Sequence, residues 1–320
     1  MTSDALSAAH APSRGLPVVL RTVAIAACLP YVVLKVVWIA DGRVGIPDGS
    51  VLLEHRTLLL AANTVTLLMD ATVVVLALLL TRPWGLRVRP WLLTLPGWAA
   101  TGLLTPIMVG YPLQLAFSEA EGGIRGSRPF LDEWVFAVVY GGFIAQGLAL
   151  GGLFLLYTGR RWGHLWRGTV GGLPRAATPP SIRICAVAGA VTATLAGAAH
   201  LSWALGSTVG LTADEIARRT ADFGALHGSR AAFAAVAAVS VLVLVFRPLP
   251  RLPLKPLLGA AWVGASTLAA WGGWLLFAAL TPLGGAEPPS ALTVSAYAVE
   301  MISGLLLSCV PARVLTARRP

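Results

Sequence analysis

Charged residues are scarce in this sequence of 320 residues: Asp, Glu, Lys and Arg together make up 12%, whereas 56% of the residues are hydrophobic. This balance lies well outside the range of soluble globular proteins. The formal net charge is +10, but the basic residues are scattered singly or in small groups between apolar runs. They do not form the basic patch with which proteins bind nucleic acid. We therefore expect a lipid bilayer, and no nucleic acid, as the partner.

Cysteine is also rare. Three cysteines are present, and all lie within or at the edge of apolar runs: Cys28, Cys185 and Cys309. This placement excludes a disulfide framework and predicts buried thiols. His55 and His227 lie near acidic residues but lack a His-x-x-x-His spacing, so we interpret them as loop histidines and predict no metal site. The sequence has no phosphate-binding or dinucleotide-binding motif, and we predict no cofactor.

Long apolar runs are abundant. About 20 apolar residues are needed to cross the hydrocarbon core of a bilayer. Eight runs reach that length, at 17–40, 58–80, 91–116, 132–157, 182–209, 225–246, 256–281 and 291–310. The sequence therefore predicts an all-α integral membrane protein with eight transmembrane helices. No connection between them is long enough for a soluble domain.

The charges in the connections alternate in sign along the chain. The N-terminus, 81–90, 158–181, 247–255 and the C-terminus hold most of the arginines and a single acid, Asp4. The connections 41–57, 117–131, 210–224 and 282–290, with their helix edges, hold fewer arginines and most of the acids. Because Lys and Arg resist translocation, the basic group of connections is predicted to be cytoplasmic. We expect a multi-pass protein of the inner (plasma) membrane with both termini in the cytoplasm.

An internal repeat connects the two halves of the chain. A shift of 165 residues places Lys35 on His200, Trp38 on Trp203, and the pair at 82–83 on the pair at 247–248, both Arg-Pro. A shift of 157 residues pairs Tyr140 with Tyr297 and Gly147 with Gly304 in the same way. These identities fall at equivalent points of the predicted spans, which favours a duplication.

The repeat defines the domain organisation. We predict a cytoplasmic tail at 1–16, a first four-helix repeat at 17–157, a cytoplasmic linker at 158–181, a second four-helix repeat at 182–310 and a tail at 311–320. Each repeat has an even number of spans, so both copies enter the membrane in the same sense. The expected fold is two tandem parallel four-helix repeats, and the sequence defines no oligomeric state.

Four ionisable side chains lie inside the predicted spans, and they are the candidate catalytic residues: Lys35, Asp70, His200 and Glu300. An ionised group at the bilayer centre costs about 2.5–3.5 kcal/mol even on the mildest scale, so such residues usually have a partner or a task. Asp70 and Glu300 both fall near mid-depth, and we predict that they share one site. Lys35 and His200 fall at equal depths, so we predict that they face each other across a pseudo-twofold axis.

Two interpretations of these residues stay open at this point. In the first they are functional, with aromatic side chains as the candidate substrate-binding residues: Trp38, Trp98, Tyr140, Trp203 and Tyr297. In the second, protonated Asp70 and Glu300 hydrogen-bond across helices as packing contacts. Lys35 then extends toward the headgroups, His200 is a hydrogen-bonded core histidine, and the tryptophans belong to an interfacial belt.

The sequence Ala-Ala-His200-Leu-Ser-Trp203-Ala-Leu-Gly206 and its echo Leu-Lys35-Val-Val-Trp38-Ile-Ala resemble a recurrent element of uncharacterised bacterial multi-pass membrane proteins. That family is built on four helices and implies no particular activity. In architecture the chain is also similar to small membrane-bound terpene cyclases, which place isolated carboxylates and tryptophans inside a helical bundle. No motif here matches those enzymes residue by residue, so the similarity implies only a function to consider.

Three functions follow from these observations. The first is an intramembrane enzyme acting on a lipid-soluble small molecule, such as an acid-initiated isoprenoid (terpene) cyclase in which Asp70 or Glu300 protonates an alkene or epoxide. Tryptophan faces would then stabilise cationic intermediates. The second is a proton-coupled small-molecule transporter or exporter, in which the two carboxyls exchange protons. The third is a non-catalytic membrane assembly partner, in which neutralising both carboxyls leaves function intact.

Overall fold

The computed structural model describes residues 15–54, 56–118, 131–217, 219–220, 222–281 and 288–318. Secondary structure in these ranges is helical, apart from an isolated β-bridge between Thr169 and Pro253. The spans are formed by α1 (Leu16–Ile39), α3 (Arg56–Thr81), α4 (Trp91–Ser118), α5 (Glu133–Trp162), α6 (Pro180–Ala204), α8 (Asp222–Phe246), α9 (Leu254–Ser266) continued by η6 (Thr267–Trp271) and α10 (Gly272–Leu280), and α11 (Ala291–Thr316).

Within the described residues, eight helices are long and apolar enough to cross a membrane. A helix satisfies its backbone hydrogen bonds internally, which hydrocarbon requires of any chain that crosses it. The predicted all-α, multi-pass class is therefore confirmed. Some boundaries differ: α5 continues to Trp162 instead of ending at 157, and α6 ends at Ala204 instead of 209.

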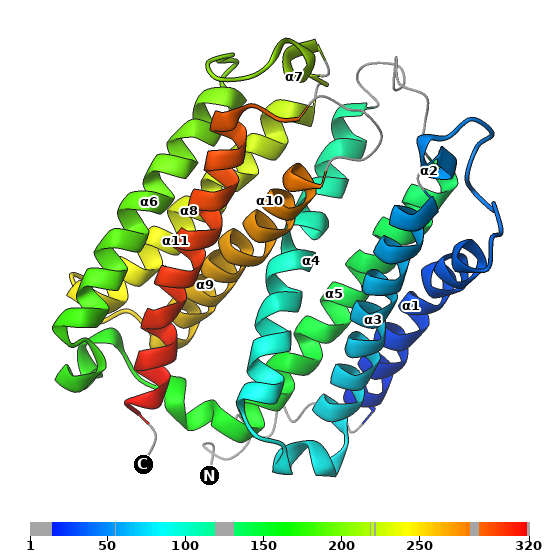
Figure 1. Ribbon diagram of the computed structural model, residues 1–320. Coiled ribbons are helices and arrows are strands. Elements are labelled where there is room, and N and C mark those ends of the chain that lie inside the picture. The colour runs from blue at the N-terminus through cyan, green and yellow to red at the C-terminus, as the bar shows by residue number, and fades with distance from the viewer. Residues whose placement is uncertain are drawn as a thin grey trace.

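The helices form two groups with α4 between them (Figure 1). In the first group α1 packs on α3 and α5, around a core that includes Tyr31, Leu93 and Leu153. In the second group α6 packs on α8 and α11, and α9 contacts both α8 and α11, around a core that includes Leu244 and Leu307. The two groups meet where α4 contacts α8, α9 and η6.

The start of α1 and the end of α11 lie at one end of the bundle, and the short helices α2 (Val51–Glu54) and α7 (Ala213–Ala217) lie at the other (Figure 1). The first of these ends also holds the 3-10 turns η1 (Pro83–Arg87), η3 (Gly163–Trp166), η4 (Val170–Gly172) and η5 (Arg175–Ala177). We call this end the arginine-rich end, because the connections 82–90, 163–179 and 247–253 contain arginines and no Asp or Glu.

Two tryptophans hold the connections that follow α1 and α6 in the same way. The indole N–H of Trp38 donates to the carbonyl of Val44 at 2.7 Å, and the indole N–H of Trp203 donates to the carbonyl of Val209 at 3.0 Å. Both side chains are buried. Each tryptophan therefore fixes the connection that leaves its own helix.

A glycine follows each of these carbonyls and has a left-handed backbone. Gly45 has φ 74° and Gly210 has φ 76°, a conformation that L side chains rarely adopt. A Cβ on Gly45 would lie 2.4 Å from the side chain of Val135 at the start of α5. A Cβ on Gly210 would lie 2.2 Å from the side chain of Leu292 at the start of α11. In each group of helices a glycine thus lets a connection pass close to the start of another helix, α5 in the first group and α11 in the second.

The seventh span is interrupted by the π-helical segment η6 where it contacts α4. Gly102 of α4 approaches this segment so closely that a Cβ there would lie 2.1 Å from the carbonyl oxygen of Ser266. Close by, the indole N–H of Trp262 donates to the hydroxyl of Thr101 at 3.2 Å. A π-bulge widens a helix locally and is often found at functional positions. Here it lies at the contact between the two groups of helices.

Candidate functional site

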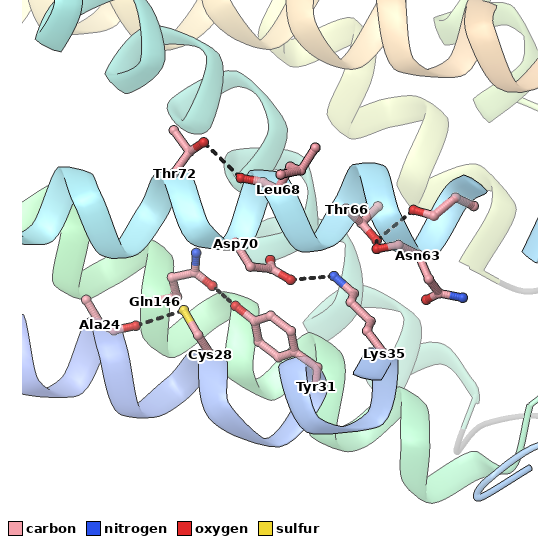
Figure 2. Close-up of polar contacts among 11 residues, drawn as sticks. Ala24, Cys28, Tyr31, Lys35, Asn63, Thr66, Leu68, Asp70, Thr72 and Gln146 are labelled. Carbon is pink, nitrogen blue, oxygen red and sulfur yellow. Dashed lines mark hydrogen bonds and ion pairs between the residues drawn. The ribbon is translucent and has the colours of Figure 1, made fainter. Parts of the chain in front are cut away.

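The first buried ion pair joins α1 and α3. The Nζ atom of Lys35 lies 2.6 Å from Oδ2 of Asp70, and the two side chains are only 10% and 6% exposed (Figure 2). Both residues come from long apolar helices, so neither charge has water as its main solvent. Each charge is instead compensated by the other, which makes the pair electrically balanced.

A second polar contact lies beside this pair and brings in α5. The hydroxyl of Tyr31 donates to the Oε1 atom of Gln146, and both side chains are buried. The ammonium group of Lys35 lies 5.2 Å from the ring centroid of Tyr31, within the range of a cation–π contact. Figure 2 shows Tyr31 and Lys35 on one face of α1, directed toward Gln146 and Asp70. The first cluster, defined as Tyr31, Lys35, Asp70 and Gln146, therefore connects three helices.

The second cluster is centred on Glu300 of α11. Its Oε2 atom accepts a hydrogen bond from Arg230 of α8 at 2.5 Å, and its Oε1 atom lies 2.9 Å from Nε2 of His200 of α6. On the far side of its ring, Nδ1 of His200 lies 2.8 Å from Nδ1 of His227 of α8. The second cluster, defined as His200, His227, Arg230 and Glu300, is a continuous chain of polar contacts across three helices.

The exposed end of this chain is His227, and the residues beyond it are buried or nearly so. His227 is partly exposed, His200 is 0% exposed and Glu300 is 4% exposed. The Arg230 side chain is 12% exposed, and its Nε atom is buried without a hydrogen-bond partner among the described residues. Nε2 of His200 has none either, because its 2.9 Å contact with Glu300 has the distance of an ion pair and not the geometry of a hydrogen bond. The chain therefore leads from a partly exposed imidazole to a carboxylate and a guanidinium inside the bundle.

Aromatic side chains surround the second cluster. The ring of Trp203 lies edge-on to His200 and His227, at 5.1 and 5.4 Å between centroids, and the ring of Phe223 lies 4.2 Å from that of His227. The guanidinium of Arg230 lies 4.8 Å from the ring centroid of Tyr297. These rings exclude water from the chain, so its electrostatic interactions are stronger than they would be at the surface.

The contact between the two imidazoles limits their protonation. A protonated imidazole has donors on both nitrogens, whereas a neutral one has a single donor and a single acceptor. At 2.8 Å between the two Nδ1 atoms, one must donate and the other accept. At least one of His200 and His227 is therefore neutral in this geometry. With both neutral, Arg230 and Glu300 balance each other and the cluster carries no net charge.

The structure brings the four ionisable residues selected from the sequence into these two clusters, in pairs that differ from the prediction. Asp70 is bonded to Lys35, and Glu300 contacts His200 and Arg230, so the two carboxylates do not share one site. Lys35 and His200 do not face each other either, because α1 and α6 lie on opposite sides of the bundle (Figure 1). Both expectations were wrong. The two groups of helices meet through α4, so α1 and α3 lie in one group while α6 and α11 lie in the other.

The predicted aromatic residues have separate positions. Trp203 and Tyr297 contact the second cluster. Tyr140 stacks on Tyr111 of α4 at 4.8 Å between ring centroids, while the Trp38 indole holds the connection after α1. Trp98 is partly exposed on α4, and no contact described for it reaches either cluster.

Two members of the second cluster were not identified as site residues from the sequence. Arg230 was not singled out, and His227 was interpreted as a loop histidine; both lie inside α8. The available signal was their spacing of three residues, which places them on one face of a helix. His55 lies outside the described residues. The expectation of buried thiols holds only for Cys28, since Cys185 is partly exposed and Cys309 is exposed on α11.

Comparisons with protein families, with curated proteins and with solved structures found no match. The class of the protein is therefore defined by the fold and the site alone. It is an all-α multi-pass membrane protein in which each group of helices holds a buried, charge-balanced cluster.

Proposed function

We propose that the protein is a proton-coupled transporter of a small molecule, and that the second cluster is where the proton is exchanged. The observation that carries this proposal is the chain from His227 through His200 to Glu300, in which neighbouring atoms lie 2.8 and 2.9 Å apart. Imidazole is the side chain whose ordinary pKa lies closest to neutral pH, and a carboxylate is a proton acceptor. Buried chains of such groups are typical of proton relays in pumps and transporters.

Coupling follows from the charge balance of the cluster. A proton that reaches His227 passes to His200 and then to Glu300, and neutral Glu300 no longer compensates Arg230. Arg230 then lies in a buried position without a counter-ion, which is costly. The protein lowers this cost by binding an anionic group of the substrate at Arg230 or by separating α8 from α11. Protonation thereby shifts the equilibrium between two conformations, which is the requirement for coupled transport.

We also propose that the protein consists of two tandem parallel four-helix repeats. Its arginine-rich end and both termini would lie on the cytoplasmic side of the inner membrane. Matching features at the sequence shifts of 165 and 157 support the repeat, namely the Trp38 and Trp203 hydrogen bonds and the Gly45 and Gly210 contacts. The charge distribution of the connections supports the orientation. Movement of one half against the other would then occur at α4 and η6.

The intramembrane enzyme, including the acid-initiated terpene cyclase, remains the competing hypothesis. A carboxyl that protonates an alkene or epoxide must itself be neutral in the resting enzyme. Glu300 contacts Arg230, which favours the ionised form of this carboxyl, and the polar chain from His227 ends at it. An ionised carboxylate at the end of such a chain is a proton acceptor, so we place proton exchange ahead of isoprenoid cyclisation.

One experiment separates the two functions. Everted membrane vesicles that contain the protein are energised to form a pH gradient and supplied with a mixture of lipophilic acids, lipophilic amines and isoprenoids. We expect one class of compound to accumulate chemically unchanged, as measured by mass spectrometry, and a protonophore to abolish the accumulation. Formation of a new product that is insensitive to the protonophore would instead support the enzyme and reject the transporter.

A further inference from the structure

Two pockets open at the arginine-rich end, one in each group of helices. The first lies where α3 ends beside the last turns of α5. Its lining residues include Arg82, Leu86, Leu156 and Arg160. The second lies where α8 ends beside the start of α6, and it is lined by Arg175, Thr178, Arg183, Val245, Phe246 and Arg247. Each has a cavity volume of about 320 Å³. We call them the α3 pocket and the α8 pocket.

The arginines at these pockets divide into two kinds. Arg161 and Arg247 are structural: Arg161 donates to the carbonyls of Gly85 and Val88, and Arg247 donates to those of Leu173 and Pro174. They hold the connections that shape the pockets. A second set has exposed side chains that line the pockets: Arg82, Arg160, Arg175 and Arg183. Of these, Arg183 also donates from Nε to the carbonyl of Thr178 at 3.2 Å. Each pocket therefore presents two exposed guanidinium groups.

Among the described residues, no Asp or Glu at this end competes for these guanidinium groups. The connections of this end contain no Asp or Glu, and the acids of the described residues lie in the spans or at the opposite end. Arginine forms forked, charge-assisted hydrogen bonds with phosphate oxygens, for which its planar geometry is well suited. The charge of both pockets thus fits an anion that carries a phosphate group.

The walls of the pockets identify the source of that phosphate. The α3 pocket combines its arginines with Pro17, Leu80, Leu86, Leu153 and Leu156. The α8 pocket combines its arginines with Val245 and Phe246, and Phe246 is 54% exposed. Apolar side chains exposed at the ends of membrane-spanning helices face acyl chains. A free phosphate ion would gain nothing from such walls, whereas a phospholipid places its phosphate at the arginines and its glycerol and acyl chains on the apolar residues.

We propose that the α3 and α8 pockets are two binding sites for anionic phospholipids, one in each group of helices. The two sites use corresponding positions, since Arg82 and Arg247 are related by the shift of 165 residues. The occupant is an anionic phospholipid such as phosphatidylglycerol, in which no headgroup amine offsets the phosphate charge. Zwitterionic lipids carry such an amine next to the phosphate, and no Asp or Glu in the described part of this end is available to pair with it.

Native mass spectrometry of the full-length protein tests the proposal by counting bound lipids. With phosphatidylglycerol we expect two tightly bound molecules for the wild type. The variant Arg82→Gln/Arg160→Gln and the variant Arg175→Gln/Arg183→Gln are each expected to retain one. Because each basic residue near a charged membrane surface changes lipid affinity by about fivefold, removing two arginines is expected to weaken one site by more than about tenfold. Arg161 and Arg247 are left in place, and among the described residues the one side-chain hydrogen bond to backbone that these variants remove is that of Arg183 to the carbonyl of Thr178.

The matched control is Arg87→Gln/Arg251→Gln, which removes two exposed charges at the same end but outside the lining of both pockets. It is expected to keep both lipids. The proposal is overturned if this control loses lipids as readily as the pocket variants, or if phosphatidylcholine binds as tightly as phosphatidylglycerol. It is also overturned if inorganic phosphate displaces the lipids, since the pockets would then be sites for free phosphate.

Discussion

Replacing Arg230 with methionine is expected to lower the free energy of unfolding by about 3–5 kcal/mol, because it leaves the Glu300 carboxylate buried without a counter-ion. The Glu300 side chain is 5% exposed and accepts from Arg230 at 2.5 Å. Methionine keeps much of the aliphatic length of arginine, so the change removes the charge with little loss of packing. Reversible denaturant unfolding of the protein in detergent measures the effect.

The chain offers a matched control for this prediction. Arg56 forms an ion pair with Asp41 at the same short range, 2.6 Å, but the two side chains are 58% and 65% exposed. Arg56→Met is therefore expected to change the free energy of unfolding by less than about 1 kcal/mol. The double variant Arg230→Met/Glu300→Gln removes both charges and is expected to recover most of the lost stability. If Arg230→Met costs no more than Arg56→Met, the buried ion pair does not stabilise the fold.

Glu300→Gln is expected to reduce the charge movement that follows a pH jump by more than about tenfold. A proton that enters at His227 has Glu300 as its final acceptor, and a glutamine at this position cannot bind it. The measurement is the transient current of proteoliposomes on a solid-supported membrane after a rapid change of external pH. It uses the proton itself as the probe and requires no knowledge of the transported compound.

Two variants separate this effect from misfolding and from general loss of buried charge. Arg230→Met/Glu300→Gln carries no uncompensated charge, so it is expected to be stable and still to lack the current. Asp70→Asn changes the carboxyl of the first cluster, which is bonded to Lys35 in the other group of helices. It is expected to keep the current. A current that survives in both Glu300 variants would show that another group exchanges the proton.

Much of the fold was readable from the sequence because the bilayer sets a simple length requirement. Runs of about 20 apolar residues have to be helices that satisfy their own hydrogen bonds, and eight such helices are present among the described residues. The end of α6 was predicted five residues too late because Leu205 and Val209 were read as a continuation of the apolar run. Gly206, with φ 98°, ends the helix there, so the signal was the glycine and not the hydropathy.

The site was only partly predictable, because the sequence identifies buried charges more readily than their partners. Lys35, Asp70, His200 and Glu300 stood out within apolar runs, and all four lie in the two clusters. Partners come from helices distant in sequence: Arg230 and Glu300 are separated by 70 residues.

Arg230 was missed for a related reason. An arginine near the start of a span is usually able to reach the headgroups, and the sequence does not show that this one turns inward. The direction of the Arg230 side chain depends on the rotation of α8 about its own axis relative to α11. Helix packing sets that rotation.

The most direct test of the account is infrared difference spectroscopy of the protein in lipid across a pH step. It detects whether a buried carboxyl gains a proton, and which carboxyl it is. We expect the band of a protonated carboxyl to appear in the wild type and in Asp70→Asn, together with changes in the imidazole bands, and to be missing in Glu300→Gln. A band that persists in Glu300→Gln and disappears in Asp70→Asn would assign the proton to the first cluster and contradict the proposed role of Glu300.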